Sequence, residues 1–277
     1  MNLQPALGRE ESSLAYWATA SEHYVGALAN AYHTHRLQVI RSLIPNALYC
    51  PGQTIFDFGC GDAVLFPEFL AAGAQISGID IAPEMIVLAH QHLRDQGYET
   101  SLAKQADVDY LTQIPTASLD ALLSFNVLAY LTDTEEQQFY REAQRIVKPG
   151  GYLIVTHSNQ LFDLFSCNHY TVEFFKQQFA TAADRDRLDA LFSWVTLPEQ
   201  SVSNAVSYNV RENPLSYRYK LADYGFQELH QEFIHFHPLP PALLTEKTYV
   251  DTLQVAERDR WKLMFMCSTF GSCAIRQ

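Results

Sequence analysis

The feature that most constrains the fold is a regular alternation of strand-like and helix-like segments between residues 54 and 157. Short runs of apolar and β-branched residues, each ended by a turn, predict strands over 54–58, 75–81, 100–106, 119–125 and 152–157. Amphipathic stretches between them predict helices over 63–72, 84–96 and 134–147. This order is typical of a parallel sheet with right-handed crossovers, so we expect an α/β, Rossmann-like fold.

The segments on either side of this alternation carry weaker signals. Aromatic and apolar residues at helical spacing predict one or two amphipathic helices over 12–43. After residue 157 the rhythm breaks, and we expect helices over 171–179, 184–194, 214–224 and 245–258, with strands over 226–237 and 261–276. These last two strands would form a hairpin-like pair at the edge of the sheet.

No internal repeat or charge block divides the chain, which indicates one continuous domain with an insertion. We expect four parts: an N-terminal helical lid (1–50), a ligand-binding core (51–157), an inserted helical cap (158–213) and a C-terminal completion of the sheet (214–277). In the lid, Tyr24 is the residue that we expect to touch a ligand. The aromatic-rich cap would carry ligand selectivity, because extensions on a rigid sheet commonly do, and it is a candidate homodimer surface.

Composition excludes several kinds of partner. Thirty-one acidic residues against 19 basic ones give a net charge of −12, so no positive field exists to gather nucleic acid or anionic lipid. The N-terminus lacks the pattern of a secretory signal and no stretch is apolar enough to span a membrane, so we expect a cytoplasmic protein. The five cysteines are too scattered for a zinc site or a disulfide framework.

The most informative motif is the run Asp57-Phe58-Gly59-Cys60-Gly61, in which a strand enters a glycine turn and then a helix. Glycine allows a sharp turn and a close approach of the backbone to a ligand, and the helix start offers unpaired N–H groups. The dinucleotide motif G-x-G-x-x-G needs a third glycine where this chain has Val64. The sequence therefore argues against the usual pyrophosphate site, although glycines at a strand end are also ordinary turn residues.

Polar residues follow the neighbouring strands as well. Asp80 ends the second strand about 20 residues after the glycine turn, a spacing at which a carboxylate can accept the hydroxyls of a ribose. Asp107 follows the third strand, and Asn126 and Tyr130 follow the fourth. Ligands of open α/β sheets bind outside the carboxyl ends of the strands, so these groups predict one crevice, although each residue alone is also a common cap or turn residue.

These motifs occur together, and in this order, in a known family. They are Asp57-Phe58-Gly59-Cys60-Gly61, Gly78-Ile79-Asp80, Asp107, Ser124-Phe125-Asn126-Val127-Leu128 and Val147-Lys148-Pro149-Gly150-Gly151. Over residues 54–157 the chain resembles the class I S-adenosylmethionine-dependent methyltransferases. The resemblance implies a seven-stranded sheet with an antiparallel last strand, and S-adenosylmethionine as a cofactor that leaves as S-adenosylhomocysteine.

The resemblance also implies how the site residues are used. The methionine part of the cofactor would be bordered by Asp57, Gly59 and Gly61, with its amino group met by the backbone of Phe125 or Asn126. The ribose hydroxyls would be bound by Asp80, with Ile81 and Met85 packed near ribose and adenine, and the adenine amino group would be faced by Asp107, with Ala106 beside it. Where the family often has a third glycine, this chain has the small residue Ala63.

The expected reaction is methyl transfer to an oxygen or nitrogen of a small polar acceptor. A fainter resemblance is to methyltransferases of surface-polysaccharide gene clusters. It is carried by Asn159-Gln160-Leu161-Phe162-Asp163, Tyr170-Thr171-Val172-Glu173-Phe174-Phe175, Glu212-Asn213-Pro214-Leu215 and His235-Phe236-His237-Pro238-Leu239-Pro240-Pro241. It implies a nucleotide-linked or glycan sugar as the acceptor. Two other functions stay open, a catalytically silent protein that binds S-adenosylmethionine and, against the evidence of Val64, a nicotinamide-dependent oxidoreductase.

Histidines are the candidate bases for an acceptor that must lose a proton. His157 ends the fifth predicted strand on the side where the acceptor would lie, and His237 precedes a proline-rich turn. His235 and His237 would share a strand face by the period of two, which could suggest a metal pair, but no third ligand is evident and we expect no metal site.

Overall fold

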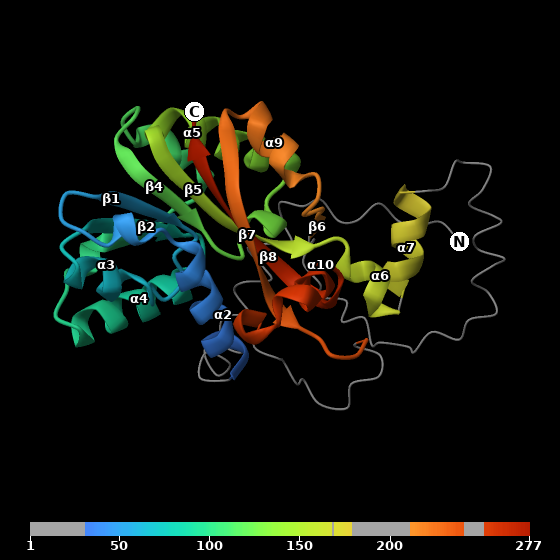
Figure 1. The fold of residues 1–277 in the computed structure, drawn as a ribbon. Coiled ribbons are helices and arrows are strands. Elements are labelled where there is room, and N and C mark those ends of the chain that lie inside the picture. Colours follow the sequence, from blue (N-terminus) through green and yellow to red (C-terminus); the bar gives the residue numbers. More distant parts are fainter. Residues whose placement is uncertain (1–30, 168, 179–210, 241–251) are drawn as a thin grey trace.

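The computed structural model describes residues 31–167, 169–178, 211–240 and 252–277. Its centre is a twisted sheet of eight strands (Figure 1). The strands are β1 (Thr54–Phe58), β2 (Gln75–Asp80), β3 (Ala103–Gln105), β4 (Leu119–Ser124), β5 (Val147–Asn159), β6 (Arg211–Glu212), β7 (Phe226–Phe236) and β8 (Cys267–Arg276). The predicted α/β, Rossmann-like fold is therefore confirmed.

The strand order is β3-β2-β1-β4-β5-β8-β7, with the two-residue β6 paired to the end of β5. Strands β1 to β5 are parallel, whereas β8 runs antiparallel to both β5 and β7. The order reverses between β1 and β4, so the carboxyl ends of these two strands flank the crevice where open α/β sheets bind ligands. The expected seven-stranded sheet with an antiparallel last strand is present, with β6 added.

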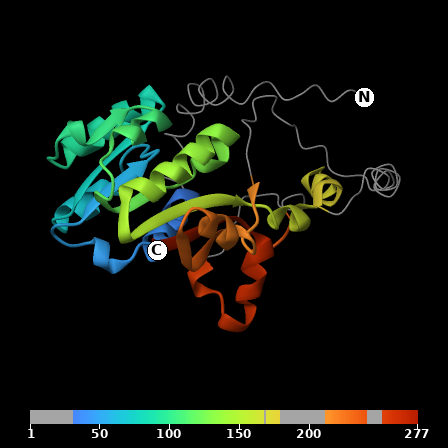
Figure 2. The same ribbon diagram turned by 90° about the horizontal axis from the view of Figure 1, so that it is seen from above.

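Helices cover both faces of the sheet (Figures 1 and 2). One face carries α2 (Ala31–Leu43), α3 (Phe66–Ala71) and α4 (Pro83–Asp95), whose apolar side chains pack in one core cluster with strand residues such as Ile55 and Ile154. The other face carries η3 (Val108–Gln113), α5 (Asp133–Ile146) and α9 (Tyr217–Asp223), packed in a second cluster with Phe58 and Leu122.

The remaining helical segments lie at the ends of the strands. Short 3₁₀ turns are η1 (Asn46–Leu48), η2 (Thr100–Leu102), η4 (Leu128–Tyr130), η6 (Thr252–Gln254) and η7 (Glu257–Lys262). Helices α6 (Phe162–Ser166) and α7 (His169–Gln178) follow β5, and α10 (Leu263–Met266) directly precedes β8. Figure 1 shows α6 and α7 standing away from the sheet, next to the extended end of β5.

Two predicted boundaries were wrong for local reasons. The helix expected from residue 63 begins at Phe66, because Ala63 takes a φ of 56° and continues the glycine turn. The strand expected over 261–276 begins only at Cys267, because η7 and α10 occupy the preceding residues and leave Trp261 exposed.

The fifth strand is longer than predicted at both ends. It begins at Val147, which pairs with Leu119, and a bulge that contains Gly150 precedes the regular pairing of Tyr152 with Ala121. At its other end β5 runs on to Asn159, past the last residue of β4. The last residues of β5 therefore extend past β4 on the side of the crevice, where they pair with β6 and β8.

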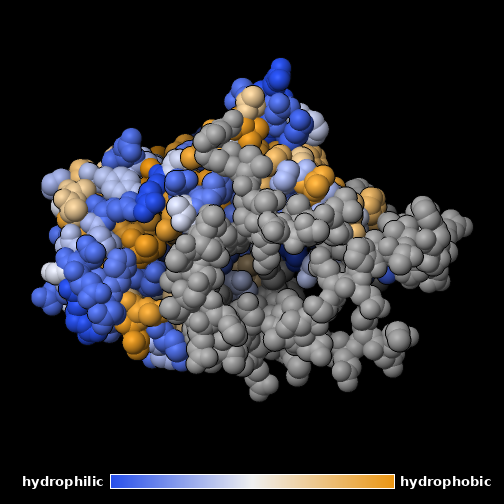
Figure 3. Space-filling model, turned by 90° about the horizontal axis from the view of Figure 1, so that it is seen from below, coloured by the Kyte–Doolittle hydropathy of each residue, from blue (hydrophilic) through white to orange (hydrophobic). Residues whose placement is uncertain are grey.

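On the face that Figure 3 shows, the described residues are mainly hydrophilic, with separated apolar patches. Among the residues with described side chains, the exposed large apolar or aromatic ones are Val87, Leu215, Tyr219, Leu229, Leu239, Leu253 and Trp261. Within the described ranges, none of the helices has both the length and the apolar character that crossing a membrane requires.

Candidate functional site

A pocket of about 830 Å³, open to solvent, lies at the carboxyl ends of β1, β2, β3 and β4. It is lined by Phe58, Gly59, Gly61, Ile79, Asp80, Ile81, Met85, Ala106, Asp107, Val108, Phe125, Asn126, Val127, Tyr130, Leu131 and Glu135. Every residue predicted to contact the cofactor lies on this wall except Asp57. The structure thus brings residues from five separate segments of the sequence to one cavity.

The glycine turn after β1 forms one side of the pocket. The N–H groups of Gly59 and Cys60 both donate to the carbonyl oxygen of Ile79, at 2.8 Å each, which ties the turn to β2. Gly59 has a φ of 79°, and a Cβ atom there would lie 2.1 Å from Cγ2 of Val127. Only glycine meets both conditions, so the turn keeps its shape and the pocket stays open beside it.

Asp80 at the end of β2 is the carboxylate that joins the two loops of the pocket. Its Oδ2 accepts a hydrogen bond from the N–H of Gly61 (2.9 Å), and its Oδ1 accepts one from the N–H of Ala82 (2.9 Å). Burial raises the pKa of Asp80, and these hydrogen bonds oppose that change. A carboxylate offers about four acceptor positions, so two remain for a ligand.

Asp57 lies in β1 directly before the turn and does not line the pocket. Its side chain is 4% exposed, and Oδ1 has no hydrogen-bond partner among the described residues. Burial, together with the nearby carboxyls of Asp80 and Asp62, raises the pKa of Asp57 to about 8. Asp57 was expected to border the ligand, but the structure places it behind the glycine turn.

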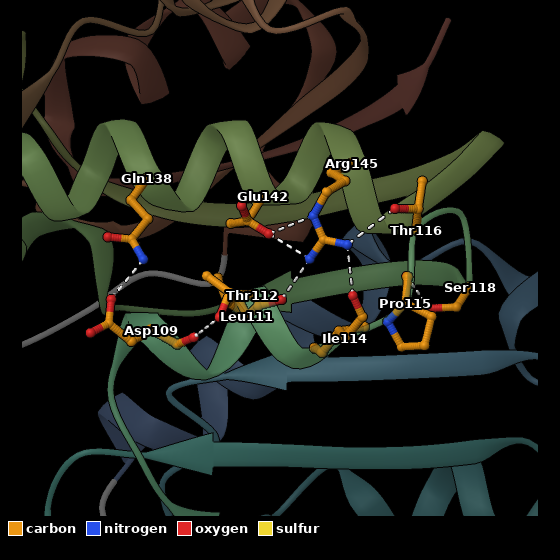
Figure 4. A network of polar contacts seen from close by, with 10 residues as sticks. All are labelled: Asp109, Leu111, Thr112, Ile114, Pro115, Thr116, Ser118, Gln138, Glu142 and Arg145. Atoms are coloured by element: carbon orange, nitrogen blue, oxygen red, sulfur yellow. Dashed lines mark hydrogen bonds and ion pairs between the residues drawn. The ribbon is translucent and has the colours of Figure 1, made fainter.

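The far wall is built by the loop that follows β3. Asp107 caps η3, because its Oδ1 accepts the N–H of Asp109 at 3.0 Å, while the side chain itself remains exposed at the pocket. Arg145 of α5 donates to the carbonyl oxygens of Ile114 (2.8 Å) and Leu111 (2.9 Å), as Figure 4 shows. These contacts hold η3 against α5 and thereby fix the position of Asp107.

Gln138 strengthens this attachment. Its side-chain amide donates to Oδ1 of Asp109 at 2.8 Å (Figure 4). Gln138 lies about two helical turns before Arg145 along α5. The loop after β3 is therefore attached to α5 at two separated points, so this wall of the pocket is preorganised.

The segment after β4 closes the pocket on the third side. Asn126 has a φ of 63°, and its N–H donates to Oγ1 of Thr156 on β5 (2.8 Å). Farther along, Thr132 and Glu135 form a capping box at the start of α5, in which each side chain accepts a hydrogen bond from the backbone N–H of the other. Glu135 also lines the pocket, so the start of α5 is part of the site.

His157 does not reach the pocket. Its side chain is 2% exposed and packs against Tyr217, with ring centroids 4.5 Å apart, and against Phe270 at 5.5 Å. Burial and the positive charge of Lys220 hold its pKa well below the usual range. The strand alternation places His157 on the α9 face of the sheet, so this position does not support the predicted role as a catalytic base.

The other predicted histidines lie outside the pocket as well. His235 is fully buried with a φ of 64°, and its ring centroid lies 6.2 Å from that of His35. That backbone conformation breaks the strand alternation, and β7 ends at Phe236, so His235 and His237 do not share a strand face. His237 instead lies with its ring centroid 4.8 Å from that of Phe162, and burial lowers its pKa to about 4.

Tyr24, the third residue expected to act in catalysis, lies outside the described residues. So do the helix predicted over 184–194 and most of the lid. Among the residues that the structure does describe, no group of three or more His, Cys, Asp or Glu side chains is placed to hold a metal ion.

Sequence reasoning missed several pocket residues. The apolar ones are Phe58, Ile79, Val108, Val127 and Leu131, and they carry no distinctive signal because they also belong to core strands and turns. Glu135 could have been found, since Thr132 and Glu135 have the T-x-x-E spacing of a capping box that marks the start of a helix.

Comparison with known proteins identifies the central domain. Residues 56–155 match the family described as "Methyltransferase domain". A relative named ubiquinone biosynthesis O-methyltransferase, from Xanthomonas oryzae pv. oryzae (strain PXO99A), is 29% identical over 161 residues, which are 57% of this chain and 66% of that protein. A relative of the same name from Xylella fastidiosa (strain 9a5c) is 29% identical over 136 residues, 49% of this chain and 52% of that protein. The chain therefore covers between about half and two thirds of these relatives.

Solved structures agree with the fold. Magnesium protoporphyrin IX methyltransferase from Synechocystis PCC 6803, determined with bound S-adenosylmethionine, superposes with a TM-score of 0.58 at 14% identity, covering 99% of this chain and all of that one (100%). An S-adenosylmethionine-dependent methyltransferase from Mesorhizobium loti gives a TM-score of 0.54 at 19% identity, covering 87% and 98%. These matches agree with the predicted resemblance: residues 56–155 match a methyltransferase domain, and the fold is that of class I S-adenosylmethionine-dependent methyltransferases.

Proposed function

We propose that the protein binds S-adenosylmethionine in the pocket at the carboxyl edge of the sheet and transfers its methyl group to a small acceptor. The observation that carries this proposal is the placement of Asp80 and Asp107. The two carboxylates stand at the ends of adjacent strands and face one pocket together with an open glycine turn. This combination suits a nucleoside with a cationic amino acid end.

The donor set fits the cofactor part by part. Asp80 keeps two acceptor positions for the ribose hydroxyls after its bonds to Gly61 and Ala82. Apolar side chains of Ile81, Met85 and Val108 line the same pocket and would sandwich the adenine, whose amino group would donate to Asp107. The methionine end would lie along the glycine turn and the loop that begins at Asn126.

When bound, S-adenosylmethionine supplies an electrophilic methyl group on a sulfonium. The protein's own part is to hold the acceptor in line and to exclude water, and positioning of this kind is worth about 7 to 11 kcal/mol of barrier. Neither His157 nor His237 lines the pocket, so we assign no general base among the described residues.

We propose an oxygen acceptor, because the relatives with the same domain are named O-methyltransferases. The acceptor would be selected beyond the pocket, where β5 extends toward α6 and α7. The cap over 158–213 would carry that choice. We propose a small soluble acceptor, since the net charge of −12 disfavours the binding of nucleic acid.

Isothermal titration of S-adenosylmethionine tests the cofactor site. We expect Asp80→Asn and Asp107→Asn each to weaken binding about tenfold, which corresponds to about 1.4 kcal/mol. Asp223→Asn is the matched control, since this exposed carboxylate at the end of α9 lies outside the pocket. No binding to the folded wild type, or equal losses in all three variants, would contradict the proposal.

A second assay tests the acceptor. Wild-type protein is incubated with S-adenosylmethionine and separate panels of sugar nucleotides and phenols, and S-adenosylhomocysteine is quantified. We expect product with one panel and none with Asp80→Asn at the same concentration of cofactor. Tight binding of the cofactor without turnover on either panel would favour the catalytically silent alternative.

A further inference from the structure

Three carboxyl side chains meet at the glycine turn, and they differ in hydrogen bonding and in burial. Asp80 accepts two backbone N–H groups, and Asp62 is half-buried in the turn itself. Asp57 is the most buried of the three at 4% exposure, and its Oδ1 has no hydrogen-bond partner within the described part of the chain. An ionised carboxyl in that position would be buried without a partner, which is costly.

Among the residues that the structure describes, the groups that act on Asp57 offer it no compensating positive charge. The charged groups that act on it are Asp80, at the end of β2, and Asp62, in the turn, and both are acidic. Burial, and after it the neighbouring carboxyls, raise the pKa of the Cys60 thiol in the same turn. Burial and like charge therefore act in the same direction and raise the pKa of Asp57 to about 8, so the carboxyl is mostly neutral at pH 7.

A cationic ligand in the pocket changes this balance. The pocket is lined from Phe58 onward, directly after Asp57, and S-adenosylmethionine carries a sulfonium that its product lacks. A positive charge brought to the turn favours the ionised carboxyl, as any nearby opposite charge does. Ionisation of Asp57 then supplies the counter-charge that the empty site does not hold.

We propose that Asp57 is the charge-compensating residue of this site: it is protonated while the pocket is empty and releases its proton to solvent when S-adenosylmethionine binds. The proposal rests on the cofactor assigned under the proposed function. It makes cofactor binding tighter as pH rises, and it makes the product, which has one positive charge fewer, drive less proton release. Asp57 thereby discriminates substrate cofactor from product without touching either.

Proton release is measured by isothermal titration at pH 7 in phosphate and in Tris, two buffers with different ionisation enthalpies. For wild type we expect release approaching one proton per S-adenosylmethionine bound and clearly less for S-adenosylhomocysteine. The amino group common to both ligands cancels in this comparison. Equal proton counts for the two ligands, or none with S-adenosylmethionine, would overturn the proposal on wild type alone.

Two variants assign the proton. Asp57→Asn, which imitates the neutral carboxyl in shape, is expected to bind with no ligand-dependent difference in proton count and with a smaller preference for S-adenosylmethionine. Asp163→Asn is the matched control, because Asp163 is also a buried carboxyl with a raised pKa but pairs with Arg211 outside the pocket. It should release protons as the wild type does.

The possible failures are separable. If neither ligand binds the wild type, the proposed function fails and the charge-compensating role fails with it. If both bind and the wild-type difference in proton count survives in Asp57→Asn, the function stands and the role of Asp57 is wrong. Should Asp57→Asn fail to fold, the wild-type comparison of the two ligands still decides.

Discussion

Asp80 shows what the sequence could and could not reveal about a single residue. Its place at the end of a strand, with its spacing from the glycine turn, was enough to predict a pocket carboxylate. Its bonds to the N–H groups of Gly61 and Ala82 join segments distant in sequence and follow only from the folded turn. The sequence also could not show that Asp57 lies behind the turn, because that depends on the direction of its side chain in the folded strand.

The glycine turn gives a prediction about two separate costs. Gly59→Ala adds a Cβ atom 2.1 Å from Val127 and forces a φ of 79° on alanine. We expect it to lower the free energy of unfolding by about 2 kcal/mol or more and to weaken cofactor binding. Adding Val127→Ala should recover only the steric part.

Gly52→Ala is the control for this prediction, measured with the others by urea unfolding. Its φ is 87°, but a Cβ atom there would meet nothing within 4 Å. It should therefore cost only the backbone part, about 1–2 kcal/mol. If Gly59→Ala lowered the free energy of unfolding no more than Gly52→Ala, the predicted clash with Val127 would be contradicted.

The buried carboxyl of Asp57 predicts how the stability of the empty protein depends on pH. Its pKa is about 8 when folded and 3.8 as the ordinary value, so between these values the folded state binds more protons than the unfolded state. The contribution of Asp57 to the free energy of unfolding is therefore fully present below pH 3.8 and is lost as pH rises through about 8. We expect the free energy of unfolding of Asp57→Asn to exceed that of the wild type increasingly from pH 5 to pH 8, and a difference independent of pH would contradict this.

At the scale of elements, the strands were easier to predict than the places where they stop. Apolar runs located β1, β2 and β4 to within one residue, because buried parallel strands have few polar positions. The strand predicted from Trp261 was partly wrong, because apolar residues of 3₁₀ turns have no period that separates them from a strand.

The contact between α9 and α5 gives a prediction at this scale. Lys220 of α9 donates to Oε1 of Glu136 (2.7 Å) and also to Glu212 of β6. Lys220→Met would leave two partly buried carboxylates facing each other, so we expect a loss of about 2 kcal/mol or more in unfolding free energy. Adding Glu212→Gln should restore part of it.

The exposed pair of Arg41 and Glu68 is the matched control for that ion-pair prediction. Since surface pairs contribute about 0–1 kcal/mol, Arg41→Ala should change the melting temperature much less than Lys220→Met. Similar effects of the two substitutions would show that burial adds nothing at Lys220. Cofactor titration of Lys220→Met would also show whether α5, whose first turn lines the pocket, depends on this contact.

For the whole molecule, the sheet and the cofactor pocket could be predicted because both follow from local signals repeated in order along one stretch of chain. The acceptor side could not, since it depends on how β5, β6 and α7 meet segments distant in sequence. His157 illustrates this limit: its position at a strand end suggested an acceptor contact, whereas α9 covers that face and buries the ring against Tyr217.

The most direct test of the central claim is a crystal structure of the protein grown with S-adenosylhomocysteine. We predict electron density for the whole molecule in the pocket, with the ribose hydroxyls at Asp80, the adenine amino group at Asp107 and the homocysteine part along the turn at Gly59. Density for the ligand at another surface, or a pocket that stays empty at saturating ligand, would contradict the assignment of this site and of the function built on it.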